Sequence, residues 1–357
     1  MDPPALSIDD YVAAHEEEEV TSVPWMLLEF LPYIANRENA STARCDSWNG
    51  KEIQVTVCPR RPPRVSYLCV HSPRDDIAAE PEIIATEDDL ILLRVIFGSP
   101  EDLLSQACLE NLHYYVYQAD DGSGRPSLTH LPRIPLCQSS FDAIDMGILR
   151  YDNKEYIVAG IVADLHGSFS SSDDEEGYYY FYHNTCKVLA IGGQDATMAF
   201  VDLWRGILYC DVRKLLQQQA AACHARTGEE AIPILRFVPT PSSIDKDKVP
   251  RGDARLWRNI AVVDGRLKYV ELQLHWDPTL LSEGLYITDG WVAATFSRPT
   301  DISSSSDNNG DYSWRQDCYL DTKKTDFRND PLLKLLPKAS SYQGRKPAPP
   351  FKGLHIR

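Results

Sequence analysis

Residues 258–272 read RNIAVVDGRLKYVEL, in which two runs of alternating apolar residues flank the dipeptide Asp264-Gly265. A two-residue hairpin loop of type I′ needs positive φ at both central residues, and Asp-Gly is among the pairs that adopt it most readily. The stretch therefore predicts a tight β-hairpin. Because hairpins join antiparallel strands, it favours an antiparallel, all-β fold.

Two further hairpins are predicted upstream. Asp152-Asn153-Lys154 separates ILRY from YIVAGIV, and Trp204-Arg205-Gly206 separates AFVDL from ILYCDV. The three turns recur at roughly 50–60 residues, the period of four-stranded propeller blades with loop insertions. Other runs rich in Val, Ile, Tyr and Phe are typical of strands; they span 53–58, 65–70, 82–85, 90–97, 114–119, 148–151, 156–162, 178–183 and 187–191. We predict a β-propeller-like fold of five or six antiparallel blades.

The remaining segments set the expected domain bounds. Residues 212–225 contain strong helix formers without Gly or Pro, and they predict one inserted helix. Residues 1–22 are polar and acidic and predict a flexible arm, while residues 331–357 form a basic, Pro-containing tail. The propeller-like body then spans residues 23–330. Its apolar first segment, 24–35, is expected to lie in the core.

The composition limits the classes of partner. The chain of 357 residues has a formal net charge of −16, which argues against binding to nucleic acid or to a membrane surface. Nine cysteines without a C-x-x-C pair are typical of a reducing compartment. No signal peptide is evident, and no apolar run reaches the ~18 residues of a membrane span. We expect a cytoplasmic protein, with the nucleus as the alternative compartment.

Motifs for catalysis or cofactor binding are absent from the sequence. It has no G-x-S-x-G nucleophile elbow, no Walker pattern and no G-x-G-x-x-G fingerprint. His183 with Cys186, and Cys223 with His224, are the close His/Cys pairs, but a zinc site would require both pairs to meet in space. We predict no catalytic residue, no cofactor and no metal.

Tryptophans recur through the C-terminal half beside predicted strands. Large side chains of this kind are usually buried, so we expect them to fill the space between stacked sheets. In the alternative interpretation they cluster at a propeller mouth and bind a partner. The residues concerned are Trp204, Trp257, Trp276, Trp291 and Trp314.

The same half of the chain resembles a known family. The segments that carry the resemblance are AFVDLWRGILYCDV (199–212), ILRFVPTP (234–241), RNIAVVDGRLKYVEL (258–272), GWVAATFSR (290–298) and DYSWRQDCYLD (311–321). Together with segments at 24–42, 50–73 and 85–98, they are similar to the plant, grass-expanded domain of unknown function 1618 family. The resemblance implies a β-propeller like those of F-box-associated and kelch-like proteins. It implies no activity and provides no catalytic motif.

These observations predict a non-catalytic module for protein–protein interaction, in an adaptor, regulatory or stress-response role. The predicted partner-binding loop consists of Asp173, Asp174, Glu175 and Glu176; a second acidic loop tip lies at 307–311. Exposed charges of one sign favour a partner with a basic surface. The alternative is an enzyme with a carboxylate-based site in the propeller channel, which rests on the abundance of Asp and Glu. A channel-facing cluster of His, Asp and Glu with strongly shifted pKa values would distinguish it from the interaction module. The partner's identity and the oligomeric state stay open.

Overall fold

The chain forms β-sheets with a single α-helix among the residues that the structure describes. The computed structural model describes residues 25–47, 50–73, 77–101, 111–120, 124–132, 146–151, 155–161, 183–192, 196–225, 235–244, 252–282, 285–300 and 314–324. These residues contain five sheets, which confirms the all-β prediction. The chain divides into two compact units: unit 1 comprises Met1–Tyr180, Gly192–Ala199 and Cys210–Ile234, and unit 2 comprises Phe181–Ile191, Phe200–Tyr209 and Leu235–Arg357.

The first sheet of unit 1 is an antiparallel meander with two short parallel additions. Its strands are β1 (Leu27–Leu28), β2 (Tyr33–Ile34), β3 (Ala43–Asp46), β4 (Glu52–Cys58) and β5 (Val65–His71). β1 and β2 both pair with β5 in parallel, an arrangement that antiparallel blades do not predict.

The segment that contains β1 and β2 is less buried than expected. Trp25, Phe30 and Ile34 have exposed fractions of 52%, 49% and 49%. Each strand has only two residues and lies at the edge of the sheet. Neighbouring side chains therefore face water, and the prediction that the segment lies in the core is wrong for these three residues.

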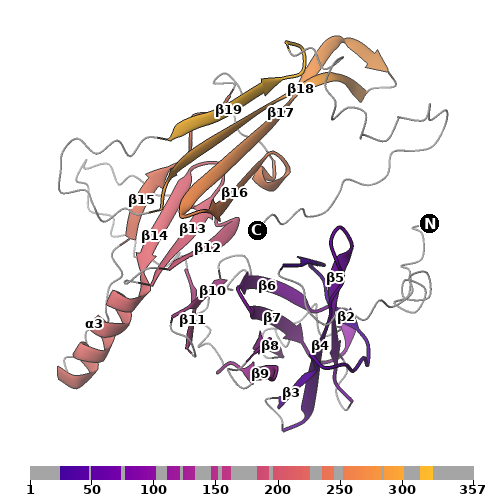
Figure 1. Ribbon diagram of the computed structural model, residues 1–357, viewed down its shortest axis with the longest axis vertical. Helices are drawn as coiled ribbons and strands as arrows, with labels where there is room; N and C mark the ends of the chain where they lie inside the picture. The colour runs from indigo at the N-terminus through magenta and orange to yellow at the C-terminus, as the bar shows by residue number, and fades with distance from the viewer. Residues whose placement is uncertain are drawn as a thin grey trace, which may run out of the picture. The chain divides into compact units, whose positions relative to one another are not determined.

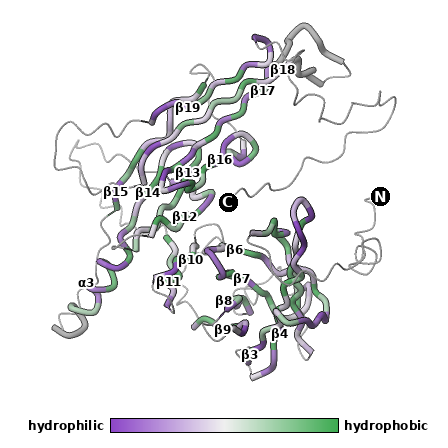
Figure 2. Tube along the Cα trace, in the orientation of Figure 1, coloured by the Kyte–Doolittle hydropathy of each residue, from purple (hydrophilic) through white to green (hydrophobic). Residues whose placement is uncertain are grey.

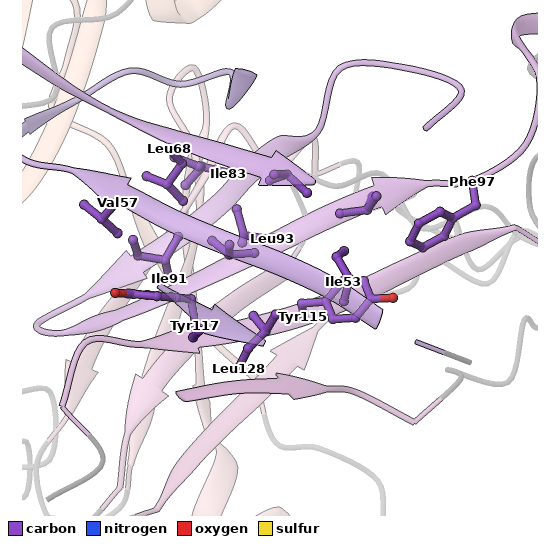
Figure 3. Packing of buried hydrophobic residues seen from close by; sticks show 14 residues of the cluster. Ile53, Val57, Leu68, Ile83, Ile91, Leu93, Phe97, Tyr115, Tyr117 and Leu128 are labelled. Atoms are coloured by element: carbon purple, nitrogen blue, oxygen red, sulfur yellow. The ribbon is translucent and has the colours of Figure 1, made fainter. Parts of the chain in front are cut away.

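Two more sheets follow in unit 1. β6 (Glu82–Glu87), β7 (Leu90–Ile96), β8 (Leu112–Gln118) and β9 (Ser127–His130) form a four-stranded meander in chain order, and β10 (Met146–Arg150) pairs with β11 (Tyr156–Gly160) as an antiparallel hairpin. The first and second sheets share a core (Figure 3) made of Ala43, Ile53, Val55, Val57, Leu68, Val70, Ile83, Ile91, Leu93, Val95, Phe97, Tyr115, Tyr117 and Leu128.

The second sheet is covered on both faces. Leu90, Leu92, Tyr114 and Val116 face away from that core and pack with residues of β10. This follows from the alternation of side chains along a strand, since both sets of alternating residues are apolar. Stacked meanders of this kind are the building pattern of propeller blades.

The fourth sheet has the order β12-β13-β14-β15. Its strands are β12 (Lys187–Gly192), β13 (Thr197–Asp202), β14 (Gly206–Asp211) and β15 (Leu235–Pro239). The turn at Trp204-Arg205-Gly206 joins β13 to β14, as predicted. β14 leads into α3 (Val212–Ala225), which has the predicted bounds of the inserted helix.

The fifth sheet belongs to unit 2 and contains the longest strands (Figure 1). Its strands are β16 (Arg258–Val263), β17 (Arg266–Ser282), β18 (Leu285–Pro299) and β19 (Arg315–Asp321), and η3 (Ala254–Leu256) precedes β16. Asp264 and Gly265 have φ of 51° and 68°, which confirms the predicted type of turn between β16 and β17. Hydrophilic and hydrophobic residues follow one another along the coloured parts of β17 and β18 (Figure 2).

Other expectations lie partly or wholly outside the described residues. The strand at 178–183 does so except for His183, and the turn at 152–154, the arm at 1–22 and the tail at 331–357 do so entirely. The bounds of the body at 23–330 stay a prediction. Within the described part of the chain, no helix is both long and apolar enough to cross a membrane.

Candidate protein interface

β19 is the most exposed strand at the edge of a sheet in the described part of the chain. It pairs with β18 on one side and ends the strand order on the other. All five residues from Arg315 to Tyr319 are exposed, whereas β16, at the opposite edge of the same sheet, has no exposed residue. An edge strand of this length presents a row of backbone groups that another strand can pair with.

The backbone of Tyr319 points to the open side of β19. Thr322 donates its N–H to the carbonyl of Trp291 on β18, with an N···O distance of 3.0 Å. Backbone groups of successive residues point to opposite edges of a strand, so Leu320 faces β18 as Thr322 does, and Tyr319 faces away from it. The Tyr319 side chain is 46% exposed. Tyr319 therefore offers both main-chain groups and an aromatic ring to a partner.

An ion pair connects β19 to β17. Asp317 accepts hydrogen bonds from Lys268 Nζ on β17 at 2.7 Å and from Ser297 Oγ on β18 at 2.9 Å. The hydrogen bond from Lys268 is the main cause that lowers the pKa of Asp317. The Asp317 carboxylate therefore points toward β17 and β18, and it does not cover the backbone groups on the open edge of β19.

The far end of β19 is fixed by Thr322. Its hydroxyl accepts the Trp291 N–H at 2.8 Å and donates to the Trp291 carbonyl at 2.9 Å. Asp321 also contacts His275 Nε2, at 3.2 Å from its Oδ1. Gly290 lies close by, because a Cβ there would come within 2.7 Å of the Thr322 hydroxyl. These contacts connect the C-terminal end of β19 to β17 and β18.

One face of this sheet rests on a set of charged and aromatic residues, called the charged core below: Trp204, Arg258, Tyr269 and Glu271. All of them are buried except Trp204, which is partly exposed. Arg258 and Glu271 are 4% and 1% exposed and form an ion pair with an N···O distance of 3.1 Å. The Arg258 guanidinium lies 4.4 Å from the centre of the Trp204 ring. Arg258 and the Tyr269 hydroxyl both donate to the carbonyl of Leu203, at 3.1 Å.

Glu271 is satisfied by several donors. Its Oε1 accepts hydrogen bonds from the Ser243 hydroxyl at 2.8 Å and from the backbone N–H of Ile244 at 3.3 Å. Gln273 donates to the same oxygen. Burying a charge is costly unless it is paired and hydrogen-bonded, and both conditions are met here. The charged core therefore acts as the internal support of the sheet.

The sequence contains a signal for this ion pair that a search for apolar alternation does not detect. A two-residue turn at Asp264-Gly265 pairs Val263 with Arg266, and counting outward places Arg258 directly opposite Glu271. Opposite charges at directly paired positions attract each other across an antiparallel sheet. The exposed edge at Tyr319 had no such signal, because the order of strands in a sheet does not follow from local alternation.

The residues predicted to bind a partner or a metal are placed as follows. Asp173, Asp174, Glu175 and Glu176 lie outside the described residues, as do residues 307–311 and the side chains of Cys223 and His224. His183 is partly buried, and burial lowers its pKa; the Cys186 thiol donates to the carbonyl of Asn184 at 3.5 Å. In the part of the chain that the structure describes, no group of three or more His, Cys, Asp and Glu residues is arranged to hold a metal.

The described tryptophans of unit 2 do not reach full burial. Trp291 is 36% exposed, and Trp204, Trp257 and Trp314 are intermediate. Trp314 donates its indole N–H to the carbonyl of Pro239 at 2.8 Å and packs against Tyr269, with ring centres 5.7 Å apart. Trp204 and Trp314 thus pack against the interior, whereas Trp291 presents part of its surface to solvent.

The fifth sheet lies in a region with a recognised family pattern. Residues 200–343 match the model of a family described as "Protein of unknown function (DUF1618)". The match confirms the predicted similarity to this family over that region and includes β16 to β19. It begins at residue 200, so the resemblance of the segments between 24 and 98 stays a prediction. No curated protein and no solved structure matches the chain.

Proposed function

We propose that this protein is a non-catalytic interaction module that binds an extended segment of a partner protein along β19. The observation that carries the proposal is the exposure of Arg315 to Tyr319 on a strand that, among the described residues, is paired on one side only. In β-strand addition, main-chain hydrogen bonds supply affinity, and alternate side chains supply specificity. The exposed Tyr319 and Trp291 rings suit a partner segment that carries apolar or cationic side chains.

The charge of the chain indicates the character of the partner. Its net charge is −16, and the acidic stretch Asp173, Asp174, Glu175 and Glu176 would attract a basic segment at a distance. Such attraction mainly raises the association rate, and salt weakens it because the Debye length is only ~8 Å at physiological ionic strength. We propose that this stretch steers the partner, which β19 then binds.

A peptide-display library panned against the full chain tests the use of β19. The retained peptides are measured on Tyr319→Pro and on its matched control Tyr319→Ala. Proline removes the outward N–H without removing a bond to β18, whereas alanine removes only the ring. We expect the proline variant to bind about three- to tenfold more weakly than the alanine variant, the loss of one hydrogen bond.

Three results would contradict the use of β19. Equal affinity of the two variants would show that the partner does not pair with Tyr319. A folding defect specific to Tyr319→Pro, seen as a lower melting temperature than that of Tyr319→Ala, would show that the N–H faces β18. Concentration-dependent dimers that Tyr319→Pro abolishes would identify a second copy of the chain as the occupant.

The steering role is tested separately. Replacing Asp173, Asp174, Glu175 and Glu176 by Asn and Gln removes four negative charges. We expect slower association of a basic retained peptide at low salt, and a smaller dependence of its rate on salt than in the wild type. Association that is unaffected by both the substitutions and salt would remove the acidic stretch from the mechanism.

The architecture and location are part of the same proposal. We propose that the stacked meanders are blades of a propeller-like domain, supported by the double-sided packing of β6 to β9. A closed ring in a crystal or electron-microscopy structure would confirm it, and an open array would contradict it.

We place the protein in the cytoplasm or nucleus on its cysteine usage. Turnover in a metabolite screen would instead favour the enzyme alternative.

A further inference from the structure

The face of β4 and β5 that points away from the apolar core of unit 1 carries two cysteines side by side. In the antiparallel register Cys58 lies opposite Tyr67, and Thr56 lies opposite Cys69. Since side chains alternate along a strand, Cys58, Tyr67 and Cys69 share one face of the sheet. Ile53, Val55 and Val57 occupy the other face, in the apolar core of unit 1. Cys58 and Cys69 are therefore diagonal neighbours on adjacent strands.

The two cysteine side chains are in contact and differ in access. A hydrogen bond joins the Cys69 side chain to that of Cys58, and this bond together with burial raises the pKa of the Cys69 thiol. Cys69 is 1% exposed, whereas Cys58 is partly exposed. An oxidant in solution therefore reaches Cys58 first. The Cys69 thiol is buried next to Cys58 and is protected from solvent.

An aromatic side chain contacts Cys58, and a cationic side chain lies next to that aromatic ring. Tyr67 hydrogen-bonds both Cys58 and Arg60, while burial is the main cause that raises its pKa to about 12. The Arg60 guanidinium lies 5.4 Å from the centre of the Tyr67 ring. Reactive cysteines are found in partly exposed sites with positive charge nearby. Cys318 on β19 has a different setting: it is exposed and lies on a strand of unit 2.

We propose that Cys58 and Cys69 form a peroxide-sensitive thiol pair that closes reversibly to a disulfide. The Cys58 thiolate attacks one oxygen of a hydroperoxide, so that the O–O bond breaks, Cys58 becomes a sulfenic acid and hydroxide or alkoxide leaves. The Cys69 thiol then attacks the sulfenic sulfur. The S–O bond breaks, water leaves and the disulfide forms, so the two thiols lose two hydrogens and the peroxide is reduced.

The diagonal arrangement makes this disulfide reversible. Directly opposed residues of an antiparallel pair are closer together than diagonal ones, and a disulfide requires close approach of its Cα atoms. Formation of the disulfide therefore requires the backbones of β4 and β5 to move closer at Cys58 and Cys69. Disulfides that hold strain are more easily reduced than relaxed ones. The proposed thiol pair is independent of the proposed binding at β19.

Peptide mapping of the full chain tests the proposal. The protein is treated with hydrogen peroxide, alkylated and cleaved with trypsin, which cuts after Arg60 and Arg64 and so separates Cys58 from Cys69. We expect a linked pair of peptides, 52–60 with 65–74, about 2 Da lighter than the sum of the two thiol peptides. Glutathione or dithiothreitol should return both thiols. Cys318→Ser, the matched control, should form the same link.

Variants assign the two roles. In Cys69→Ser, dimedone should trap a sulfenic acid on Cys58, while Cys58→Ser should leave Cys69 unmodified at the same peroxide dose. Absence of the 52–60 and 65–74 link in the wild type, while Cys318 is oxidised, would overturn the proposal. Dimedone on Cys69 before Cys58 would overturn it as well. The wild-type map needs no variant, so a folding defect in either variant leaves the test valid.

Discussion

The two units are stabilised by different kinds of interior. In unit 1 the shared core of the first two sheets consists of aliphatic and aromatic side chains, among them Leu68, Leu93 and Val95 at 0% exposure. In unit 2 the interior face of the fifth sheet contains the buried pair Arg258 and Glu271. An apolar core depends on filled volume, whereas a buried ion pair depends on the presence of both partners. The same kind of substitution should therefore have different consequences in the two units.

The largest effect is expected from breaking the charged core. Arg258→Met leaves the Glu271 carboxylate buried without its counter-ion, and we expect a loss of about 3–5 kcal/mol in the free energy of unfolding. Chemical denaturation followed by tryptophan fluorescence measures it. The surface control is Arg255→Met, whose partner Asp253 is 41% exposed; exposed pairs contribute about 0–1 kcal/mol.

A double variant sharpens this test. Arg258→Met with Glu271→Leu removes both charges, so most of the stability lost in the single variant should return. A single variant as stable as the Arg255→Met control would show that the ion pair is not buried in solution. A double variant no better than the single one would show that packing, not charge, is what Arg258 provides.

A smaller effect is expected from the turn between β16 and β17. Gly265 has φ of +68°, and a Cβ there would meet nothing within 4 Å. Gly265→Val therefore tests backbone strain without a steric clash, and we expect a loss of about 1–3 kcal/mol. Gly265→Asn is the matched control, because asparagine tolerates positive φ and should cost less. Equal stability of the Val and Asn variants would contradict a type I′ turn.

Unit 1 makes a comparable turn with different residues. Glu87 pairs with Leu90 across a two-residue loop in which Asp88 has φ of 50°. The sequence at this turn, Asp88-Asp89, has no glycine and did not predict a hairpin. The hairpin at Asp264-Gly265 was predicted correctly because glycine adopts positive φ readily and so indicates a tight turn. Sequence reasoning missed the turn after β6 because aspartate adopts positive φ less readily than glycine, so Asp88-Asp89 is not a strong hairpin signal.

The sequence predicted elements better than their partners. Alternation located β4, β5, β7 and β8, and helix formers located α3 to the residue, since these signals are local. The parallel pairing of β1 and of β2 with β5 was not predictable, because a strand of two residues is too short to show a periodic pattern of apolar residues. Nor was the open edge at Tyr319, which depends on strand order. The candidate interface therefore required the structure, whereas the fold class did not.

The smallest effect is expected from a titratable pair in unit 1. His113 Nδ1 lies 3.2 Å from His130 Nε2, and the His130 ring packs 5.0 Å from that of Tyr115. Burial lowers the pKa of His130 from its ordinary value of 6.5. The folded state therefore binds a proton less readily than the unfolded state. The stability that neutral His130 provides is present above about pH 6.5 and is lost as the pH falls below it.

His130→Gln should remove this part of the pH dependence. Between pH 7.5 and pH 5.5 the free energy of unfolding should fall less in the variant than in the wild type, because glutamine does not titrate. Hydrogen exchange of β8 and β9 at both pH values assigns the change to unit 1, since local stability sets the rate of exchange. Equal pH slopes in the variant and the wild type would show that His130 binds its proton equally well in both states. Unit 1 would then have an interior that responds to lost volume and not to charge, in contrast to unit 2.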